Sequence, residues 1–472
     1  MKLALALFIF FTVEIFAQDS LSYSYFDKET YDLYTKQEWN ELIKVTKQAF
    51  EKGYDSYYFQ MRIGIAYYEK KNYIKATKHF ENAREYNINP TLREYLYYSY
   101  LYSGYTYKAE YYSIFFTDTL KKKLKIKNNF INSIDVFYGS FINNSIDELS
   151  NYKFHNTEKY VSSSIRYKNK YSTTFGLGLG LNFNKHIKAY INYSYLNEPK
   201  IQITKTNNYP NSTTYKTSTY LNNTQQNSFY FNFKYISNSF SLTTALNILK
   251  INDKFESPNI NYGIIYEETN VSSTNIILGI NMQQKVANFE FGLRGTYSNL
   301  NDNRQLLTEI KAIYYPFGNK NLYLIASTGY QNIAEKITST TSSGRGQNKK
   351  TTSYSSIENN NITKIKLGFK AFKYLWIETQ AYLGRINEYN ETNSFIVYND
   401  ISPITSQYRI NLISPINKHL SIFIKYLYNT REQNYYNFNI LLNYPNPPEL
   451  KTETNKTEIN NSSIIGGIKW TF

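Results

Sequence analysis

The sequence of 472 residues contains no cysteine and only four histidines. The lack of cysteine excludes disulfide frameworks, cysteine-ligated zinc sites and thiol catalysis. Beyond the N-terminal segment, no apolar run approaches the roughly 18 residues that a membrane-spanning helix needs, which excludes a helical membrane protein. Charged residues make up only 19% of the chain. The remaining composition is that of a polar chain with dispersed apolar residues.

Aromatic residues are abundant at 18% of the chain, with 51 tyrosines and 30 phenylalanines. Disordered chains are poor in aromatic residues, so the composition predicts a folded protein. The formal net charge of +16 comes from basic residues that are spread along the chain rather than clustered around a binding motif. The charge pattern therefore predicts no nucleic-acid partner.

The first 17 residues have the pattern of a secretory signal peptide. Lys2 gives a short positive start, the run from Leu3 to Val13 is apolar, and Ala17 is a small residue at the expected cleavage point. The alternative, an uncleaved membrane anchor, needs a longer apolar run. We therefore expect residues 1–17 to be a signal peptide and the protein to be exported.

Residues 18–127 are expected to form a helical domain. Apolar residues recur at helical spacing, and a shift of about 34 residues superposes Trp39 on Tyr73 and Ala49 on Ala83. This pattern resembles the tetratricopeptide repeat, which implies a short α-solenoid of about three helix pairs. The residues expected to pack the repeats are Trp39, Gly64, Tyr67, Ala76, Phe80 and Ala83. An ordinary stack of helical hairpins is the alternative.

The densest basic run lies where this domain is expected to end. Lys121, Lys122 and Lys123 are followed closely by Lys125 and Lys127. We interpret this run as a solvated linker. Contact with acidic lipid headgroups or with an anionic polymer is the alternative interpretation.

In residues 128–472 the pattern changes to alternation. Apolar and polar or small side chains alternate over about ten residues at a time, as in Phe175 to Phe183, Phe289 to Tyr297 and Leu420 to Tyr428. Such runs are typical of transmembrane barrel strands and exceed the usual ~5–6 residues of strands in a soluble β-sandwich, the alternative fold. The predicted fold class is α + β and multidomain: a short N-terminal α-solenoid followed by a transmembrane antiparallel β-barrel.

About 14 strands can be placed between Tyr160 and Phe472. A further strand at Phe130 to Phe141 would require a sixteenth, because bacterial barrels have even strand numbers. Short turns alternate with long polar connections, which we expect to be loops, at residues 204–226, 253–270, 338–356, 387–404 and 431–458. A lumen of this size is narrow enough for inward side chains or a folded loop to close it.

The last residues resemble the terminal strand of bacterial outer-membrane proteins. Gly467, Trp470 and Phe472 occur in the order Gly-x-x-Trp-x-Phe, and Trp470 and Phe472 share one face of the strand. The resemblance implies that the barrel-assembly machinery recognises these three residues.

The residues expected to line the lumen follow from the alternation. They are Lys188, Lys234, Glu290, Arg294, Glu309, Lys311, Lys364, Lys366, Trp376, Glu378, Tyr382, Lys425 and Lys469. Basic residues outnumber acidic ones in this set, so an open lumen would favour anionic or neutral solutes. The alternative is that these charges pair across a packed lumen and conduct nothing.

The sequence predicts no chemistry. The four histidines are far apart, and no His-Glu-x-x-His motif, phosphate loop or nucleophile elbow is present. We therefore expect no catalytic, cofactor-binding or metal-binding residue, and no enzyme.

The order of the domains resembles that of outer-membrane exporters of poly-N-acetylglucosamine-type exopolysaccharide, and of uncharacterised Bacteroidota barrels with the same layout. The resemblance implies an outer-membrane barrel in contact with lipid, a helical domain that binds a protein partner in the periplasm, and export or passage of a polymer such as a polysaccharide. The alternative function is a membrane-anchored scaffold that recruits periplasmic partners of a secretion or envelope-assembly complex. A simple nutrient porin would explain the barrel but not the helical domain.

Overall fold

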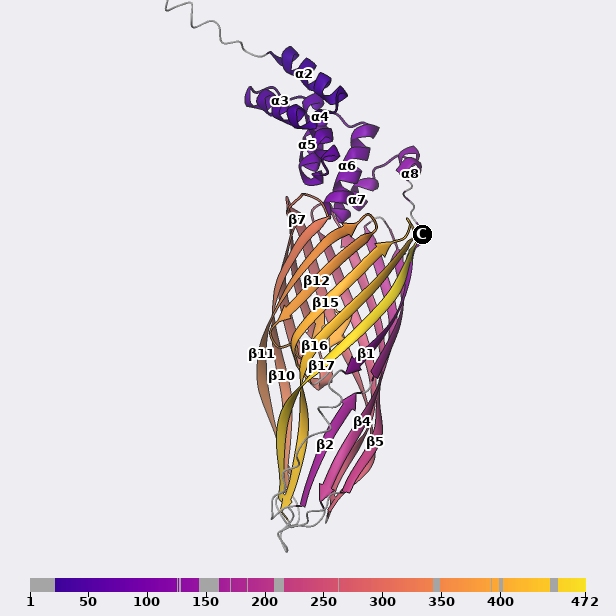
Figure 1. Cartoon of the computed structure of the whole chain (residues 1–472), viewed down its shortest axis with the longest axis vertical. Helices are drawn as coiled ribbons and strands as arrows, with labels where there is room; N and C mark the ends of the chain where they lie inside the picture. Colours follow the sequence, from indigo (N-terminus) through magenta and orange to yellow (C-terminus); the bar gives the residue numbers. More distant parts are fainter. Residues whose placement is uncertain are drawn as a thin grey trace, which may run out of the picture. The chain divides into compact units, whose positions relative to one another are not determined.

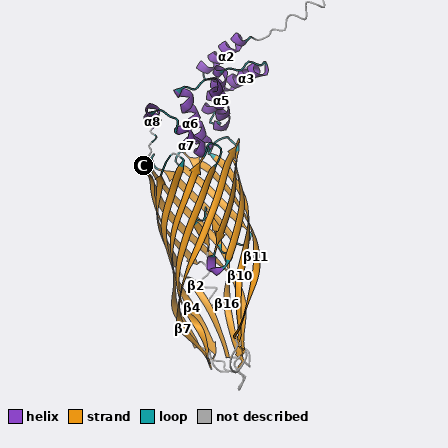
Figure 2. Cartoon of the chain, turned by 180° about the vertical axis from the view of Figure 1, so that it is seen from behind, coloured by secondary structure: helices purple, strands orange, loops and turns teal. Residues whose placement is uncertain are grey.

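The computed structural model describes residues 22–124, 126, 129–143, 161–169, 171–184, 186–207, 216–261, 263–342, 349–391, 393–398, 402–441 and 449–472. The predicted signal peptide lies outside these residues. The chain divides into two compact units, with the boundary between Leu124 and Lys125. The first is helical and the second is built of strands (Figures 1 and 2).

The described residues of the first unit form seven helices: α2 (Tyr23–Thr35), α3 (Trp39–Glu51), α4 (Tyr57–Glu69), α5 (Tyr73–Tyr86), α6 (Pro90–Ser103), α7 (Thr106–Ser113) and α8 (Asp118–Leu124). Local sequence sets their ends. The side chains of Ser56 and Asn89 cap α4 and α6 by accepting hydrogen bonds from the N–H groups of Phe59 and Leu92. Gly104 ends α6 in the left-handed conformation, with φ of 91°. None of the described helices is long and apolar enough to cross a bilayer.

The helices pack in consecutive pairs, α2 with α3, α4 with α5 and α6 with α7. Helix α4 also packs against α2 and α6, so each pair lies against the next. Part of the basic run is helical, because Lys121, Lys122 and Lys123 lie in the last turn of α8; its role as a linker stays a prediction. Positive side chains are favourable there because the carbonyl end of a helix carries partial negative charge.

The second unit is a closed antiparallel barrel of 14 strands. Its wall runs in the order β1, β3 to β12, β15, β16 and β17, and β17 pairs again with β1. The strands are β1 (Ile131–Asn143), β2 (Val161–Asn169), β3 (Tyr171–Asn182), β4 (Ile187–Asn207), β5 (Lys216–Ile236), β6 (Ser241–Asn261), β7 (Gly263–Val286), β8 (Phe289–Ser298), β9 (Arg304–Tyr314), β10 (Leu322–Ser342), β11 (Lys349–Phe372), β12 (Leu375–Leu383), β13 (Tyr389–Glu391), β14 (Ile396–Tyr398), β15 (Ile404–Pro415), β16 (Leu420–Leu441) and β17 (Glu449–Thr471). A short 3-10 helix, η2 (Leu300–Asp302), connects β8 and β9. The predicted fold class is confirmed.

The number 14 was predicted, but from a different set of strands. The stretch from Phe130 to Phe141, expected only as an extra strand, supplies β1 of the closed wall. The stretch after Tyr160 is β2, which pairs with one end of β4 while β3 pairs with the other end. On its other side β2 pairs with β16, whereas β3 pairs with β1.

The polar connections predicted as loops are largely strand. Strand β4 continues to Asn207 and β5 begins at Lys216, and β16 and β17 leave only residues 442–448 between them. Ladder hydrogen bonds join backbone groups and need no apolar side chains, and threonine and tyrosine favour strands. We call the end of the barrel that these extended strands form the hairpin end. The opposite end, which holds the short turns and Phe472, is the turn end.

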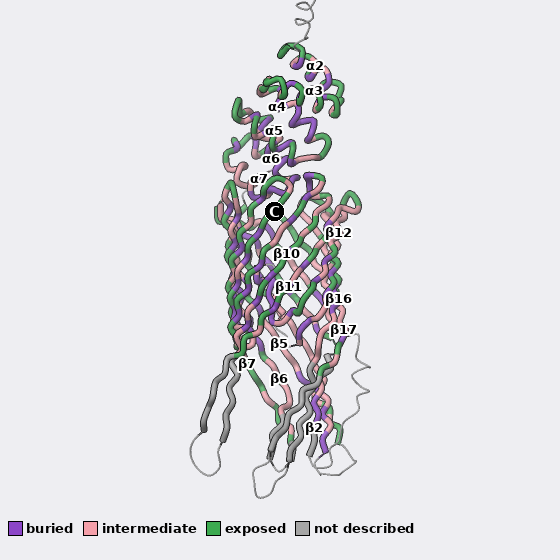
Figure 3. The backbone as a smooth tube through the Cα atoms, turned by 90° about the vertical axis from the view of Figure 1, so that its left-hand side faces the viewer, coloured by how far each residue is buried: buried purple, intermediate pink, exposed green. Residues whose placement is uncertain are grey.

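The barrel is apolar outside and polar inside. On β7, Leu278, Ile280 and Met282 are exposed on the outer face, whereas Asn275 and Asn281 alternate with them and are buried. Figure 3 shows the same alternation of exposed and buried positions along many strands. The pattern is the inverse of a soluble protein with a water-facing surface.

Exposed aromatic residues border this apolar outer face. At the turn end they are Phe183, Tyr235, Phe289, Tyr314, Phe372, Tyr374, Trp470 and Phe472. Toward the hairpin end they include Tyr171, Tyr193, Phe229, Tyr297, Tyr330 and Tyr408. Phe289 and Tyr297 of β8 are eight positions apart, about 26 Å along the strand and about 20 Å along the axis of a tilted barrel.

Inward aromatic rings are accommodated by glycine. Three inward aromatic residues each lie directly across from a glycine of the next strand: Phe137 from Gly176, Tyr323 from Gly368 and Phe423 from Gly467. A Cβ atom at Gly467 would lie 2.5 Å from the Phe423 ring. Each glycine therefore leaves room for a ring to lie flat against the wall.

Two short turns share the sequence Asn-Lys-His and the same geometry. Asn417 Oδ1 accepts hydrogen bonds of 2.8 Å from the N–H groups of His419 and Leu420. The His419 ring stacks on Trp470 with centroids 5.5 Å apart. The turn around Asn184 repeats this arrangement of hydrogen bonds. These histidines hold turns to neighbouring strands.

Candidate functional site

The connection between β12 and β15, residues 384–403, folds into the interior of the barrel. We call it the inner loop; its described residues are 384–391, 393–398 and 402–403. Within it, β13 and β14 pair as a short antiparallel hairpin. A bridge between Ile386 and Ile404 closes its base. All three residues of β13 are buried, although they lie on no wall strand.

The tip of the inner loop contacts the opposite wall. Tyr230 of β5 donates a hydrogen bond of 3.0 Å to the carbonyl of Asn393, and Asn247 of β6 donates one of 2.8 Å to the carbonyl of Ser394. The ring of Phe395 lies 5.1 Å from that of Tyr230. Because β5 and β6 lie opposite β12 and β15 in the strand order, the inner loop spans the lumen.

A buried ion pair holds the inner loop to the strand that follows it. Arg409 Nη2 of β15 donates a hydrogen bond of 2.6 Å to Glu391 Oε1, and the two residues are only 6% and 3% exposed. The hydroxyls of Tyr382 and Tyr398 also donate hydrogen bonds to the Glu391 carboxylate. One carboxylate thus joins β12, β14 and β15.

A second charged cluster grips the inner loop from the neighbouring strands. Glu309 of β9 accepts hydrogen bonds from Arg294 of β8 at 2.6 Å and from Lys364 of β11 at 2.7 Å. The Tyr389 hydroxyl of the inner loop donates to the same carboxylate at 2.9 Å. Arg294 also donates to the carbonyl of Asn390 at 3.0 Å. Four elements therefore meet at the Glu309 carboxylate.

Glu388 and an apolar cluster complete the attachment. The Glu388 carboxylate accepts hydrogen bonds from the side chains of Asn301, Asn303 and Gln305. Apolar contacts surround the base of the inner loop, in a buried cluster of Leu307, Ile362, Tyr382, Ile386, Tyr389 and Ile404. The inner loop is thus packed and hydrogen-bonded like an element of the core.

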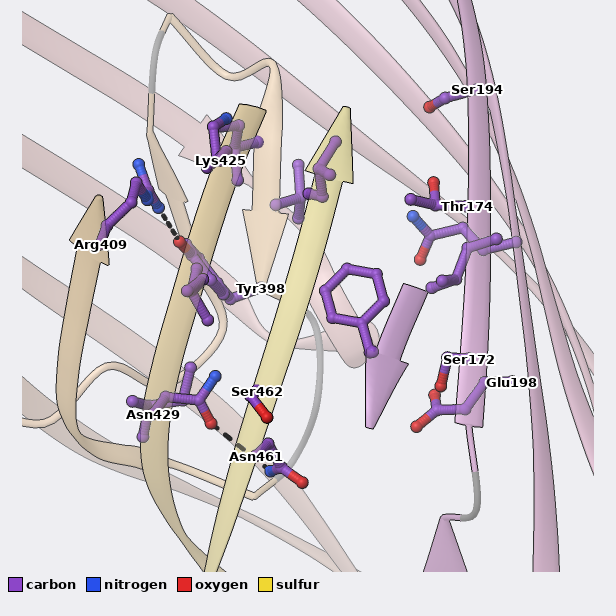
Figure 4. Close-up of a pocket in the computed structure, with 18 of the residues that line it drawn as sticks. Ser172, Thr174, Ser194, Glu198, Tyr398, Arg409, Lys425, Asn429, Asn461 and Ser462 are labelled. Carbon is purple, nitrogen blue, oxygen red and sulfur yellow. Dashed lines mark hydrogen bonds between the residues drawn. The ribbon is translucent and has the colours of Figure 1, made fainter. Parts of the chain in front are cut away.

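Two cavities adjoin the inner loop. The hairpin-side cavity has a volume of about 330 Å³ and the turn-side cavity about 250 Å³. Figure 4 shows the hairpin-side cavity, with Thr174 and Ser194 on one side of it and Tyr398 and Lys425 on the other. Both cavities are lined by Arg409 and by residues of the inner loop. The inner loop therefore divides the interior.

The residues expected to line the lumen fall into three groups. Arg294, Glu309, Lys364 and Tyr382 anchor the inner loop, as described above. Lys311, Lys366 and Lys425 line a cavity but do not anchor the inner loop. The others lie elsewhere on the inward face. Glu378 forms a salt bridge of 3.0 Å with Lys366, and Glu290 accepts a hydrogen bond from Tyr315. The Trp376 ring lies under the Lys370 ammonium group, and in the strand register Lys188 is opposite Lys234 and Lys469 is opposite Asp135. Several of these charges form salt bridges with one another on nearby strands of the same side of the barrel; whether the lumen conducts stays a prediction.

The residues expected to pack the helical repeats lie between the helices of the first unit. Ala76, Phe80 and Ala83 are fully buried, and a Cβ at Gly64 would lie 2.6 Å from the Phe80 ring. Trp39 begins α3 and lies against Tyr34, and the Tyr67 ring stacks on His79. In the predicted barrel-assembly signal, Trp470 and Phe472 are exposed on the outer face, whereas Gly467 lies under Phe423.

Sequence reasoning missed several of the groups that hold the inner loop, among them Arg409, Glu391 and Tyr398. Arg409 alternates with Tyr408 and Ile410, so the period of two could have placed it on the inward face. Glu391 and Tyr398 lie in a polar connection without periodicity, and no local signal distinguishes them. Their partners lie between 7 and 18 residues away in the sequence, but they meet only because the connection folds into the barrel.

No family model and no curated protein matches the sequence. Among solved structures, the chain is similar to a Pseudomonas aeruginosa FadL homologue, with 10% identity, a TM-score of 0.41, and coverage of 72% of this chain and 90% of that one. It is also similar to the toluene transporter TodX of P. putida, with 7% identity, a TM-score of 0.39 and coverage of 77% and 92%. The toluene transporter TbuX of Ralstonia pickettii shows 6% identity, a TM-score of 0.41 and coverage of 72% and 90%. At TM-scores this low, these likenesses carry no conclusion about the present chain.

Proposed function

We propose that this chain is an outer-membrane channel in which the inner loop is the gate. The observation that carries the proposal is the span of the inner loop across the lumen, with anchors on both walls. In a barrel whose lumen is spanned by one of its own connections, movement of that connection would control conduction.

The outer surface supports a membrane location. Its apolar face is bordered by aromatic residues at both ends, and its estimated height approaches the ~25 Å apolar band of outer-membrane barrels. The short turns and the C-terminal residue lie at one end, and in outer-membrane barrels the short turns face the periplasm. We therefore assign the turn end to the periplasm, and the predicted periplasmic location of the helical unit belongs to the same proposal.

Polymer passage makes a stronger demand than passage of small solutes. A polysaccharide threaded through the barrel would need the whole inner loop to leave the lumen, which would break the contacts of both Glu391 and Glu309. A small solute needs only a local movement at the tip. The contacts of the inner loop therefore favour small solutes, and polymer export and recruitment of partners by the helical unit stay predictions from the sequence.

The absence of native cysteine allows a direct test. An ideal Cβ at Gly279 of β7 would lie 2.6 Å from Ser394 Oγ at the loop tip, and its next neighbour is 3.5 Å away. The double variant Gly279→Cys/Ser394→Cys should therefore form a disulfide that fixes the tip to the wall. The full-length protein would be refolded and recorded in a planar bilayer under oxidising and reducing conditions.

We expect few or no openings in the oxidised double variant and recovery of openings on reduction. The single variant Ser394→Cys, treated in the same way, controls for the oxidant. Equal conductance of the oxidised and reduced double variant would show that the inner loop is not the gate. Silence of the reduced variant and of the unmodified chain would overturn the channel itself.

A further inference from the structure

We infer that the turn-side cavity is a binding site for a small, multiply charged oxyanion bearing phosphoryl or carboxylate groups. The inference rests on the proposed channel and names its class of solute.

The lining of the turn-side cavity is strongly cationic. It contains five basic residues, Arg294, Lys311, Lys364, Lys366 and Arg409, against two carboxylates, Glu309 and Glu391. The other lining residues are mostly polar, including Asn281, Gln283, Ser327 and Gln380. A partly enclosed space with this excess of positive charge concentrates anions, because the field between low-dielectric walls is weakly screened.

The carboxylates near the cavity are already engaged. Glu309 is shared by Arg294 and Lys364, and Glu391 is paired with Arg409. Beyond the lining, Glu378 pairs with Lys366 at 3.0 Å. Glu290, the remaining carboxylate with an influence on Lys311, forms no salt bridge with it among the described residues.

Both arginines of the lining keep donors that the protein does not satisfy. Arg294 Nε and Nη1 and Arg409 Nε are buried and have no hydrogen-bond acceptor in the described part of the chain. Buried donors normally have acceptors, because an unsatisfied donor costs free energy. Guanidinium groups match carboxylate and phosphate oxygens in geometry, so two arginines that line the cavity suit an oxyanion ligand.

Lys311 is held beside these arginines without a salt bridge of its own in the described residues. Its side chain runs over Gly292 of β8, where an ideal Cβ would lie 3.0 Å from Lys311 Cε and 3.7 Å from Nζ. Glycine at residue 292 therefore keeps the lysine against the wall with its ammonium group at the cavity. A volume of about 250 Å³ suits an ion of the size of phosphate or a short dicarboxylate.

The binding test uses the full-length chain in detergent, oxidised as the Gly279→Cys/Ser394→Cys variant so that the inner loop is fixed. Calorimetric titration with inorganic phosphate and, separately, with malonate at constant ionic strength measures affinity. We expect binding of at least one anion, weakened about tenfold or more by Lys311→Met and largely restored by Lys311→Arg. Stronger binding of phosphate indicates phosphoryl ligands, and stronger binding of malonate indicates carboxylates.

The matched control is Lys234→Met, which removes an inward-facing lysine of β5 that lines neither cavity. It should leave the affinity unchanged, and Gly292→Val, which crowds Lys311, should weaken binding. Absence of binding, or equal loss in the Lys311→Met and Lys234→Met variants, would overturn the site. Because this titration is made with the loop tethered, its result is independent of whether the channel opens.

Discussion

Arg409 of β15 and Glu391 of the inner loop form an ion pair of 2.6 Å in which both side chains are almost inaccessible to solvent. Such a pair adds little stability by comparison with apolar packing, but removing one partner leaves a buried charge uncompensated. The pair therefore fixes the position of the inner loop more than it stabilises the barrel.

Substitution Glu391→Gln should loosen the inner loop while the barrel stays folded. The amide keeps the shape of the carboxylate but not its charge, and loss of one partner of a buried pair costs on the order of 3 kcal/mol. Hydrogen–deuterium exchange of a peptide spanning Ile386–Tyr398 should become faster. Glu268→Gln, which breaks the exposed pair with Lys254, is the control. Unchanged exchange in the Glu391→Gln variant would mean that other contacts hold the inner loop alone.

Gly467 and Gly466 are adjacent, but we expect substitution by alanine to destabilise the barrel only at Gly467. A Cβ at residue 467 would lie 2.5 Å from the Phe423 ring and 2.7 Å from the Val136 carbonyl, whereas the nearest atom to a Cβ at 466 is 4.0 Å away. Gly467→Ala should destabilise the barrel by about 1–3 kcal/mol, and Gly466→Ala should have little effect. Heat-modifiability on gels of protein refolded in detergent measures this. Equal melting temperatures of the Gly467→Ala and Gly466→Ala variants would contradict the expected destabilisation. Gly467 would then matter only for assembly of the barrel in the cell.

Gly64→Ala should destabilise the helical unit. The Phe80 ring lies 2.6 Å from an ideal Cβ at residue 64, so the ring or the helix must shift, at a cost of about 1–3 kcal/mol. The double variant Gly64→Ala/Phe80→Leu should recover part of the loss, because leucine is smaller than phenylalanine. Urea unfolding of the full chain, followed by circular dichroism at a helical wavelength, tests this. A single variant as stable as the unmodified chain would contradict this tight packing.

The helical unit should lose stability in mild acid through His79. Burial, and then the positive charges of Lys78, Lys47 and Lys75, lower the pKa of His79 to about 4 from its usual value of 6.5. Between these values the unfolded chain binds the proton and the folded one does not, so stability falls as pH falls through about 6.5 toward 4. The full loss is at most about 3 kcal/mol.

The matched variant for this effect is His79→Gln, because glutamine does not titrate and retains polar contact near Gln60, the hydrogen-bond partner of His79 Nδ1. Urea midpoints of the helical signal at pH 7, 6 and 5 should fall more steeply for the unmodified chain than for His79→Gln. Parallel pH profiles would show that His79 is not the group responsible.

The sequence by itself determined the features that depend on neighbouring residues. Alternation of period two places Leu293 outside and Arg294 inside, because a strand directs successive side chains to opposite faces. It also indicated a barrel of about 14 strands and a preceding stack of helices with Gly64 and Phe80 between them. The boundaries of the polar strands were not predicted, because Asn-rich and Thr-rich segments have the same sequence pattern in strands as in loops.

Only the tertiary structure decided the fate of residues 387–404. In sequence this segment is a polar connection like residues 204–226, yet one becomes the inner loop and the other becomes mostly strand. The difference lies in the groups that surround it: Arg409, Glu309 and Tyr230 come from strands far apart in the sequence and meet only when the barrel closes. Periodicity shows which way a side chain faces, but closure of the wall determines which other side chains it meets. The inner loop and both cavities are therefore properties of the closed barrel, and no local pattern specifies them.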